Sequence, residues 1–486
     1  MTLRTSLLAA LCMACSTPTK SDRTPAPDDS GTTSPDSGSP GTTDGDTDSP
    51  TWSQPELTFP EDAANLSAEP GTVEVALTVD PMDFEIVDWR TRLVIPVIGH
   101  GYDSSYPAPT LRVQVGDAVQ VTASNNLADP TTIHWHGLAV PFEMDGVPWM
   151  FDPIAPGEAY TYAFTADKPG TYWYHPHFDT EAQVDRGLYG GFVVEDPDDP
   201  AVDRDLVLLL DDWREDQSLP VDADHVHGAH GAEGVWTVNG LVQPRFEVMA
   251  GERLRLRLIN TSNQGYIWLS GGASGLHVVG RDQGLLPEPE QVDRELMAPG
   301  DRVELLWTPG TDTPLPALLD IPYSLHGGEA LGESTPLVDV ELVGTAPSAL
   351  ADDWPSSPRA ATPDDTPPAF VYTFQGSAHT DDWMINGERF PDVTVKQVPV
   401  DEPVVFEVRN LSATEHPFHL HGLHMELLSR NGVAPDQYAD VDTVNLGLYE
   451  TIRLRTTAHN PGTWMAHCHI LPHGDGGMMT VLEVVE

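Results

Sequence analysis

Residues 111–138 read LRVQVGDAVQVTASNNLADPTTIHWHGL, and two further segments of the chain can be aligned with them. These are FEVMAGERLRLRLINTSNQGYIWLSGGASGLHVVG at 246–280 and VTVKQVPVDEPVVFEVRNLSATEHPFHLHGL at 393–423. Each segment begins with an alternating strand, turns, runs through a second alternating strand to an Asn, and continues into a third strand. Period-2 strands repeated about every 140 residues predict an all-β chain of three Greek-key β-sandwich domains with little helix.

The segments that follow these three copies also match one another. They read IAPGEAYTYAFTADKPGTYWYHPH at 154–177, MAPGDRVELLWTPGTDTPL at 297–315 and LGLYETIRLRTTAHNPGTWMAHCHI at 446–470. We therefore expect sandwich domains at 52–198, 199–346 and 368–486, with a Pro-rich linker at 347–367 between the second and the third.

The N-terminal residues have the composition of an export signal and a tether. Residues 1–15, MTLRTSLLAALCMAC, combine one arginine with an apolar run that is too short to span a membrane. Residues 16–51 are rich in Ser, Thr, Pro, Asp and Gly, and predict a disordered linker. We expect export to the periplasm or cell envelope, and two alternatives stay open: a lipid anchor at Cys15 that ties the protein to the outer membrane, or simple cleavage.

The charge balance excludes one class of partner. The chain has 75 acidic and 24 basic residues, a formal net charge of -51. Such a surface repels phosphate, so we expect no nucleic-acid partner. The chain has three cysteines, and once the signal is removed only Cys468 remains. No internal disulfide can then form, so the presence of Cys468 needs another explanation.

Histidines recur two residues apart in the first and third copies. The pairs are His134/His136, His175/His177, His419/His421 and His467/His469. Alternate side chains of a strand point to the same face, so each pair offers two imidazoles to one side. If the two outer domains pack together, eight imidazoles converge, which is more than one ion takes. We expect a cluster of several metal ions, and copper, zinc, iron and nickel all suit such ligands.

The middle copy lacks these histidines. It reads LHVVG where the outer copies read HWHG and HLHG, with Val279 at the second histidine position, and its downstream half has no histidine. We expect the middle domain to be structural.

The stretch HCHILPHGDGGMM at 467–479 indicates a second metal site. Because Cys468 lies between two histidines of one strand, its side chain points away from them. His473 and Met478 lie in the same short loop, and His416 opens the motif HPFHLHG. Two His, one Cys and a weak axial Met form the blue-copper electron-transfer site.

With HWHG, WYHPH, HPFHLHG and HCH…H…M in this order, residues from about 70 to 486 resemble the three-domain multicopper oxidases. That family includes laccases, bilirubin oxidases and bacterial cuprous oxidases, and its domains are cupredoxin-like. The resemblance implies four copper ions and the reduction of dioxygen to water with electrons from a small reducing substrate. It implies a type 1 copper at His416, Cys468, His473 and Met478, a type 2 copper at His134 and His419, and a type 3 pair at His136, His175, His177, His421, His467 and His469. Cys468 would then be catalytic as the electron route to the cluster.

Water formation consumes protons, so acids are expected near the cluster. Asp145, in EMDGVP after HWHG, matches the place where the family keeps such an acid, although an Asp-Gly turn would also explain it. Asp475, beside His473, is a second candidate with the same alternative. Asp442, in VDTVNL, is a candidate for a carboxylate that holds a ligating imidazole or faces the substrate.

The reducing substrate is less defined by the sequence. The 12 methionines are scattered, without the methionine-rich insert that cuprous oxidases of the family often carry, which favours a laccase-like oxidase of phenols or aromatic amines. His424 and Met425 leave open a metallo-oxidase of Cu(I) or Fe(II), and a copper-sequestering envelope protein is a further alternative. A fifth histidine group, His225, His227 and His230, predicts a solvated loop, with surface metal capture as the alternative.

Overall fold

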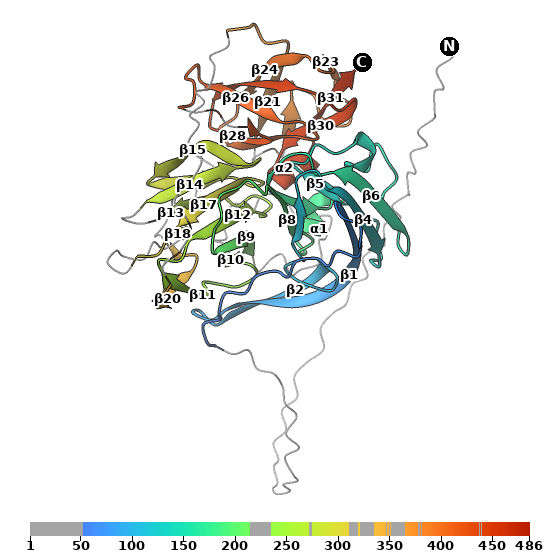
Figure 1. Ribbon diagram of the computed structural model, residues 1–486. Coiled ribbons are helices and arrows are strands. Elements are labelled where there is room, and N and C mark those ends of the chain that lie inside the picture. The colour runs from blue at the N-terminus through green and yellow to red at the C-terminus, as the bar shows by residue number, and fades with distance from the viewer. Residues whose placement is uncertain are drawn as a thin grey trace, which may run out of the picture. The chain divides into compact units, whose positions relative to one another are not determined.

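The computed structural model describes residues 52–213, 235–271, 275–310, 319–320, 335–346, 348, 350, 365–377, 380, 382–436, 438 and 440–486. Residues 50–486 form one compact unit, and its sheets follow one another along the chain in three groups (Figure 1). The expectations for residues 1–51, for the linker at 347–367 apart from residues 348, 350 and 365–367, and for the His225, His227 and His230 loop lie outside the described residues.

The first group, here called the first sandwich, consists of two four-stranded sheets ordered β2-β1-β4-β6 and β3-β8-β7-β5. The strands are β1 (Thr72–Asp88), β2 (Leu93–Tyr102), β3 (Leu111–Gln114), β4 (Ala118–Asn125), β5 (His134–His136), β6 (Ala159–Thr165), β7 (Gly170–His175) and β8 (Gly190–Glu195). The short helices η1 (Phe142–Met144) and α1 (Thr180–Val184) lie between strands. Consecutive strands β3 and β4 lie in different sheets, and one apolar core joins both sheets.

The middle sandwich has a six-stranded sheet, ordered β10-β9-β12-β17-β14-β15, and three two-stranded sheets. The long sheet contains β9 (Arg204–Trp213), β10 (Val235–Val238), β12 (Leu254–Asn260), β14 (Leu276–Arg281), β15 (Leu285–Val292) and β17 (Arg302–Trp307). The pairs are β11 (Arg245–Ala250) with β20 (Asp339–Thr345), β13 (Ile267–Ser270) with β16 (Arg294–Met297), and β18 (Leu319–Asp320) with β19 (Thr335–Pro336).

The third sandwich repeats this plan with sheets ordered β22-β21-β24-β29-β26-β27 and β23-β31-β30-β25-β28. Its first sheet contains β21 (Val371–Ser377), β22 (Asp382–Ile385), β24 (Pro403–Asn410), β26 (Met425–Arg430), β27 (Asp440–Val441) and β29 (Thr451–Thr457). Its second sheet contains β23 (Lys396–Pro399), β25 (His416–Leu420), β28 (Thr443–Leu446), β30 (Gly462–Cys468) and β31 (Met479–Val485), and helix α2 (Leu471–Asp475) follows β30. The all-β prediction is confirmed, whereas the domain boundaries stay a prediction.

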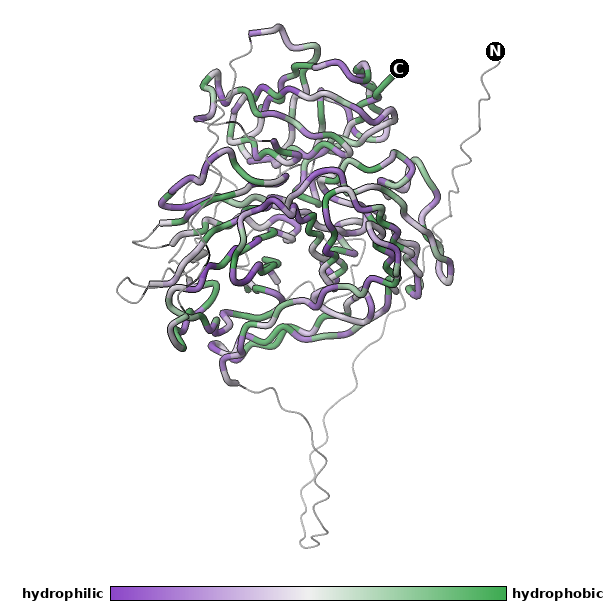
Figure 2. Tube along the Cα trace, viewed as in Figure 1, coloured by the Kyte–Doolittle hydropathy of each residue, from purple (hydrophilic) through white to green (hydrophobic). Residues whose placement is uncertain are grey.

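Alternation of apolar and polar residues explains why these segments form strands. On β4, the residues of one face are buried while those of the other are exposed or half-buried, so its apolar side chains join the core. Figure 2 shows the same change between hydrophobic and hydrophilic residues along many strands. On β5 and β25 every residue is buried, because polar imidazoles occupy the face opposite the apolar core.

The Asn that ends the second strand of each copy has the same role in all three sandwiches. Asn125, Asn260 and Asn410 each accept a backbone N–H two residues later and donate to two carbonyl groups. One of the two carbonyls belongs to the loop that follows, and the other lies more than 25 residues downstream. This side chain therefore fixes the loop that leads into the histidine strand of the outer sandwiches.

The alignment of LHVVG with the histidine motifs is wrong. Those residues lie on β14, which neighbours β17 as β26 neighbours β29 in the third sandwich. The strand equivalent to β5 and β25 is β13, which follows the Asn loop directly and carries no histidine. The two segments share only an alternating strand ending in Gly, a pattern that recurs throughout a sandwich. The middle copy nevertheless lacks a histidine at β13, the strand equivalent to β5 and β25.

Candidate metal centre

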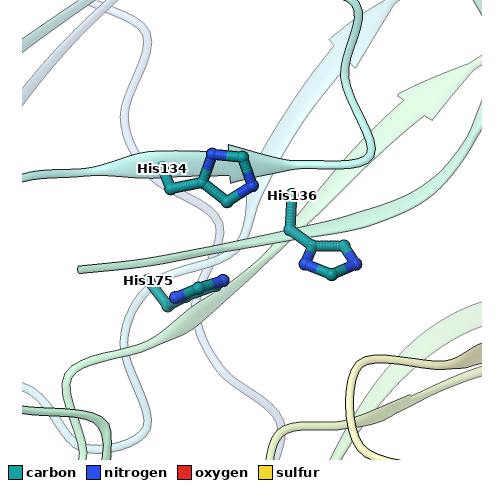
Figure 3. Close-up of side chains that lie close together, drawn as sticks. All are labelled: His134, His136 and His175. Carbon is teal, nitrogen blue, oxygen red and sulfur yellow. The ribbon is translucent and has the colours of Figure 1, made fainter. Parts of the chain in front are cut away.

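The eight paired histidines are brought together by two pairs of antiparallel strands. On β5 and β7, His134 lies opposite His175. On β25 and β30, His419 lies opposite His467. The other members follow by strand alternation or in the next turn, and all eight side chains are buried. Figure 3 shows the imidazole rings of His134, His136 and His175 close together.

Imidazoles of the first and third sandwiches meet face to face. The ring centroids of His134 and His421 are 3.9 Å apart, and those of His136 and His419 are 3.8 Å apart. His177 of the first sandwich and the third-sandwich residues His421 and His467 have ring nitrogens within 4.8 Å of one another. The two outer sandwiches therefore share one cluster of imidazoles, as the sequence predicts.

Hydrogen bonds at the rim of the cluster set the tautomers of its imidazoles. His134, His175, His419 and His467 each have Nδ1 within 3.1 Å of a backbone carbonyl oxygen, which can only accept. In these rings Nδ1 carries the hydrogen and Nε2 carries the lone pair. In His421 the Asp145 carboxylate, 2.9 Å from Nδ1, has the same effect. His136 is reversed, because its Nε2 lies 3.1 Å from the Asp442 carboxylate.

The lone pairs that result face one another across the cluster. The Nε2 atoms of His421 and His467 lie 3.0 Å apart, although neither has a hydrogen to share. Among the described residues, no hydrogen-bond partner reaches Nε2 of His134, His175, His177 or His419, Nδ1 of His136, or either nitrogen of His469. Buried nitrogens with converging lone pairs fit metal cations, which would remove their mutual repulsion.

Burial favours the neutral form of most of these imidazoles. Burial and, to a smaller extent, neighbouring imidazoles together lower the pKa of His467 to about 3. The pKa of His136, His175, His177, His421 and His469 is lowered well below the usual value, again mainly by burial. A neutral imidazole is the form that binds a metal ion, so the cluster is ready to do so at neutral pH.

A second group surrounds Cys468. Its Sγ lies 3.5 Å from Nδ1 of His416 and 3.7 Å from Nδ1 of His473, and those two nitrogens are 3.3 Å apart. All three side chains are buried. Strand pleating explains the arrangement, since Cys468 points to this group while its neighbours His467 and His469 point to the imidazole cluster.

The loop before β25 sets the tautomer of His416. The Ser412 hydroxyl lies within hydrogen-bond distance of two acceptors, the side-chain oxygen of Asn410 and the carbonyl of Thr414. Its hydrogen goes to one of these, so its oxygen accepts from Nε2 of His416 at 2.7 Å. The Nδ1 lone pair of His416 therefore points at Cys468. Because burial raises the pKa of the Cys468 thiol, a thiolate at neutral pH requires a cation beside it.

Met478 is held near this group by the backbone. Its carbonyl accepts the Cys468 N–H at 3.1 Å, and its own N–H donates to the His473 carbonyl at 2.9 Å. The side chain is fully buried in the core that contains Cys468. Trp383 of β22 stacks on the His473 ring with centroids 3.6 Å apart. Sequence spacing gave no indication of this tryptophan.

The two predicted catalytic acids lie in different environments. Asp145, at the end of η1, is buried, with its carboxylate 2.9 Å from Nδ1 of His421 and 3.2 Å from Nδ1 of His134. Asp475 is exposed at the end of α2, and its carboxylate accepts the Glu181 N–H at the start of α1. The structure thus brings the Asp145 carboxylate into hydrogen-bond distance of two cluster imidazoles, whereas Asp475 lies at the surface.

A second carboxylate, that of Asp442, contacts two other imidazoles of the cluster. It is fully buried, 3.1 Å from Nε2 of His136 and 3.4 Å from Nδ1 of His419. Burial favours its neutral form, but the Arg302 guanidinium and hydrogen bonds outweigh this and hold the pKa of Asp442 well below its usual range. Arg302 and its neighbour Asp282 come from the middle sandwich, and no motif in the sequence pointed to them.

Three β-sandwiches that carry one Cys–His centre and one imidazole cluster define a copper protein of the cupredoxin type. Multicopper oxidase family models match residues 94–199 and 362–486. The multicopper oxidase MmcO of Mycobacterium tuberculosis is 30% identical over an alignment of 426 positions that covers 79% of this chain and 82% of that protein. A laccase of Pycnoporus cinnabarinus is 28% identical, covering 77% and 84%.

Solved structures agree with this family. A multicopper oxidase from Campylobacter jejuni, described as a metallo-oxidase, superposes with a TM-score of 0.75 at 28% identity, covering 89% of this chain and 96% of that one. The chain belongs to the multicopper oxidase family and is an oxygen-dependent copper oxidoreductase. Across the described residues, no helix has both the length and the apolar character needed to cross a membrane.

Proposed function

We propose that the chain is a laccase-like oxidase with four copper ions, which oxidises phenols or aromatic amines one electron at a time. His416, Cys468, His473 and Met478 would hold the copper that accepts these electrons. The eight imidazoles of the cluster would hold the other three, with His134 and His419 on one ion and the remaining six on a pair. Copper at these sites would supply one-electron redox steps and the binding of dioxygen.

The connection between the two centres carries this proposal. Cys468 belongs to one centre, and its bonded neighbours His467 and His469 belong to the other. Electrons that arrive at the Cys468 sulfur therefore have a continuous covalent path through the backbone to two imidazoles of the cluster. Four substrate molecules each lose one electron, and one dioxygen takes up four electrons and four protons to form two waters. Asp145 lies where it can hold or pass a proton beside His134 and His421.

The surroundings of His473 support an aromatic reductant. The Trp383 indole stacks on the His473 ring. Nearby, the Phe390 N–H donates to the Gly477 carbonyl, and the Phe390 ring packs edge to face against the exposed Trp149. The residues that left room for a metal-ion substrate lie elsewhere. Met425 is fully buried in the core, and Nε2 of His424 bonds the Gly137 carbonyl. Because the Campylobacter relative is described as a metallo-oxidase, oxidation of a metal ion is the alternative to test.

Oxygen uptake by the copper-loaded protein separates these functions. We expect a phenol or an aromatic amine to sustain oxygen consumption, with one oxygen consumed per four electrons removed. Rapid uptake with Cu(I) or Fe(II) and none with phenols would establish a metallo-oxidase instead. Copper binding without turnover of any reductant would indicate sequestration. The predicted export of the protein is a separate proposal, which cell fractionation tests.

A further inference from the structure

The Asp442 carboxylate lies against the outer nitrogens of two cluster imidazoles. These are Nε2 of His136 in the first sandwich and Nδ1 of His419 in the third. The Thr443 hydroxyl donates to the same carboxylate oxygen at 2.8 Å and lies 3.0 Å from Nε2 of His136. Because these contacts occupy the outer nitrogens, the opposite nitrogens of both rings face the cluster.

Arg302 fixes this carboxylate from the middle sandwich. It lies at the start of β17, is fully buried, and donates to both oxygens of Asp442, with a distance of 2.8 Å from Nη1 to Oδ1. Its Nε donates to the Thr171 carbonyl of the first sandwich at 2.9 Å, and its Nη1 also donates to Gly300 at 3.0 Å. A single guanidinium thus contacts backbone or side chains of all three sandwiches at the edge of the cluster.

The chain leaves room for this ion pair at Gly137, the residue after the ligand candidate His136. A Cβ atom at Gly137 would lie 2.6 Å from Oδ2 of Asp442 and 2.7 Å from Nη2 of Arg302. Its φ of +88° also favours glycine. Gln283 completes the site by donating to Oδ2 at 2.5 Å. The backbone next to the cluster is therefore shaped around the Asp442–Arg302 pair.

We propose that Arg302 is a positioning residue of the copper cluster, acting through Asp442 to orient His136 and His419. The fixed fork of the guanidinium holds both carboxylate oxygens, so one of them stays within reach of the two imidazole N–H groups. This role rests on the proposed function in one respect, namely that His136 and His419 bind copper. It gives the middle sandwich, which was expected to be structural, a part in the cluster.

Copper affinity of Arg302 variants tests this proposal. Arg302→Met removes the guanidinium that holds both oxygens of the Asp442 carboxylate, and we expect the dissociation constant of the most weakly held cluster copper to rise about 10- to 100-fold. Arg302→Lys keeps the charge without the fork, and its dissociation constant should lie between those of Arg302→Met and the wild type. The measurement is chelator competition followed by copper counting, with the type 2 copper signal in electron paramagnetic resonance as a second readout. The visible band of the Cys468 centre should stay unchanged.

Arg257 provides the matched control. It is equally buried in the same sheet, on β12, and bonds Asp205, Glu304 and the Thr171 hydroxyl. We expect Arg257→Met to lower the unfolding midpoint while copper affinity changes by less than about threefold. Arg302→Met with wild-type affinity, or Arg257→Met with an equal loss, would overturn the proposal. If Arg302→Met does not fold, a wild-type affinity in Arg302→Lys would overturn it equally. Failure of the proposed function shows differently, as a wild type that binds no cluster copper.

Discussion

At the scale of single residues, Asp145 shows how one side chain organises ligands from two sandwiches. Its two carboxylate oxygens lie next to Nδ1 of His134 and Nδ1 of His421, and its backbone carbonyl lies 2.9 Å from His134 as well. A carboxylate that binds the outer nitrogen of a ligand fixes the ring and raises its basicity. Asp145 can therefore act both on copper binding and on proton delivery.

Asp145→Asn is expected to lower copper affinity or turnover about 10- to 100-fold, because an amide offers only one acceptor for two imidazole N–H groups. Copper counting after dialysis and oxygen uptake measure the two effects. Asp475→Asn is the matched control, since this exposed carboxylate bonds a backbone N–H of α1. Its turnover should change by no more than about twofold, as for typical surface substitutions. A large loss of turnover with copper retained would instead make Asp475 the proton donor.

At the scale of elements, strand β22 lies over the centre formed by Cys468. Trp383 on this strand stacks on His473 and makes an edge contact with His416, whose ring centroid is 5.8 Å away. Gly376 and Gly476 make room for it, because a Cβ at either position would lie within 3 Å of the indole. Strand β22 thus covers one face of the His473 ring with the indole of Trp383.

Trp383→Leu is expected to slow the reduction of the Cys468 centre by a phenol about tenfold, the lower end for residues that orient metal ligands. Stopped-flow bleaching of the visible band under anaerobic conditions measures this rate, and the copper count should not change. Met384→Leu is the control, because the neighbouring residue of a strand points to the opposite face. Equal rates in the two variants would remove Trp383 from the electron route.

The period-2 strand pattern predicted the histidines and the cysteine of the site, but not the residues that hold those side chains in place. Period-2 spacing was enough to place four histidine pairs and to separate Cys468 from its neighbours. The same pattern misaligned LHVVG, because any buried strand ending in Gly resembles another. Arg302 was missed for a physical reason, since a buried ion pair leaves no periodicity and its members lie 140 residues apart. Asp442 was only one candidate among 75 acidic residues until the fold placed it under His136.

At the scale of the whole molecule, the copper-free protein carries a group of imidazoles whose burial opposes protonation. Above pH 6.5 these imidazoles are neutral in both the folded and the unfolded chain. Below it the unfolded chain binds protons, whereas burial lowers the pKa of His416 and of His467 to about 3. Stability that is present above pH 6.5 is therefore lost as the pH falls toward 3.

The free energy of unfolding of the copper-free protein is expected to fall by about 1.4 kcal/mol per pH unit for each such imidazole between about pH 6.5 and pH 4. Urea unfolding at several pH values measures this slope. Acid also neutralises part of the net charge of -51, which favours the folded state. About 1 M salt screens that effect, because the Debye length is then about 3 Å. A free energy that stays constant below pH 6.5 would contradict the expectation.

At the scale of the whole molecule, the central claim is the proposal that residues 467–469 join two kinds of copper site on opposite faces of one strand. Copper counting together with the visible spectrum tests it most directly, in the wild type and in Cys468→Ser. The wild type should bind four copper ions per chain and show an intense thiolate band, whereas Cys468→Ser should lose the band and one copper while the other three remain. A wild type without the band, or a variant that loses the cluster copper with it, would contradict two separate centres joined at residues 467–469.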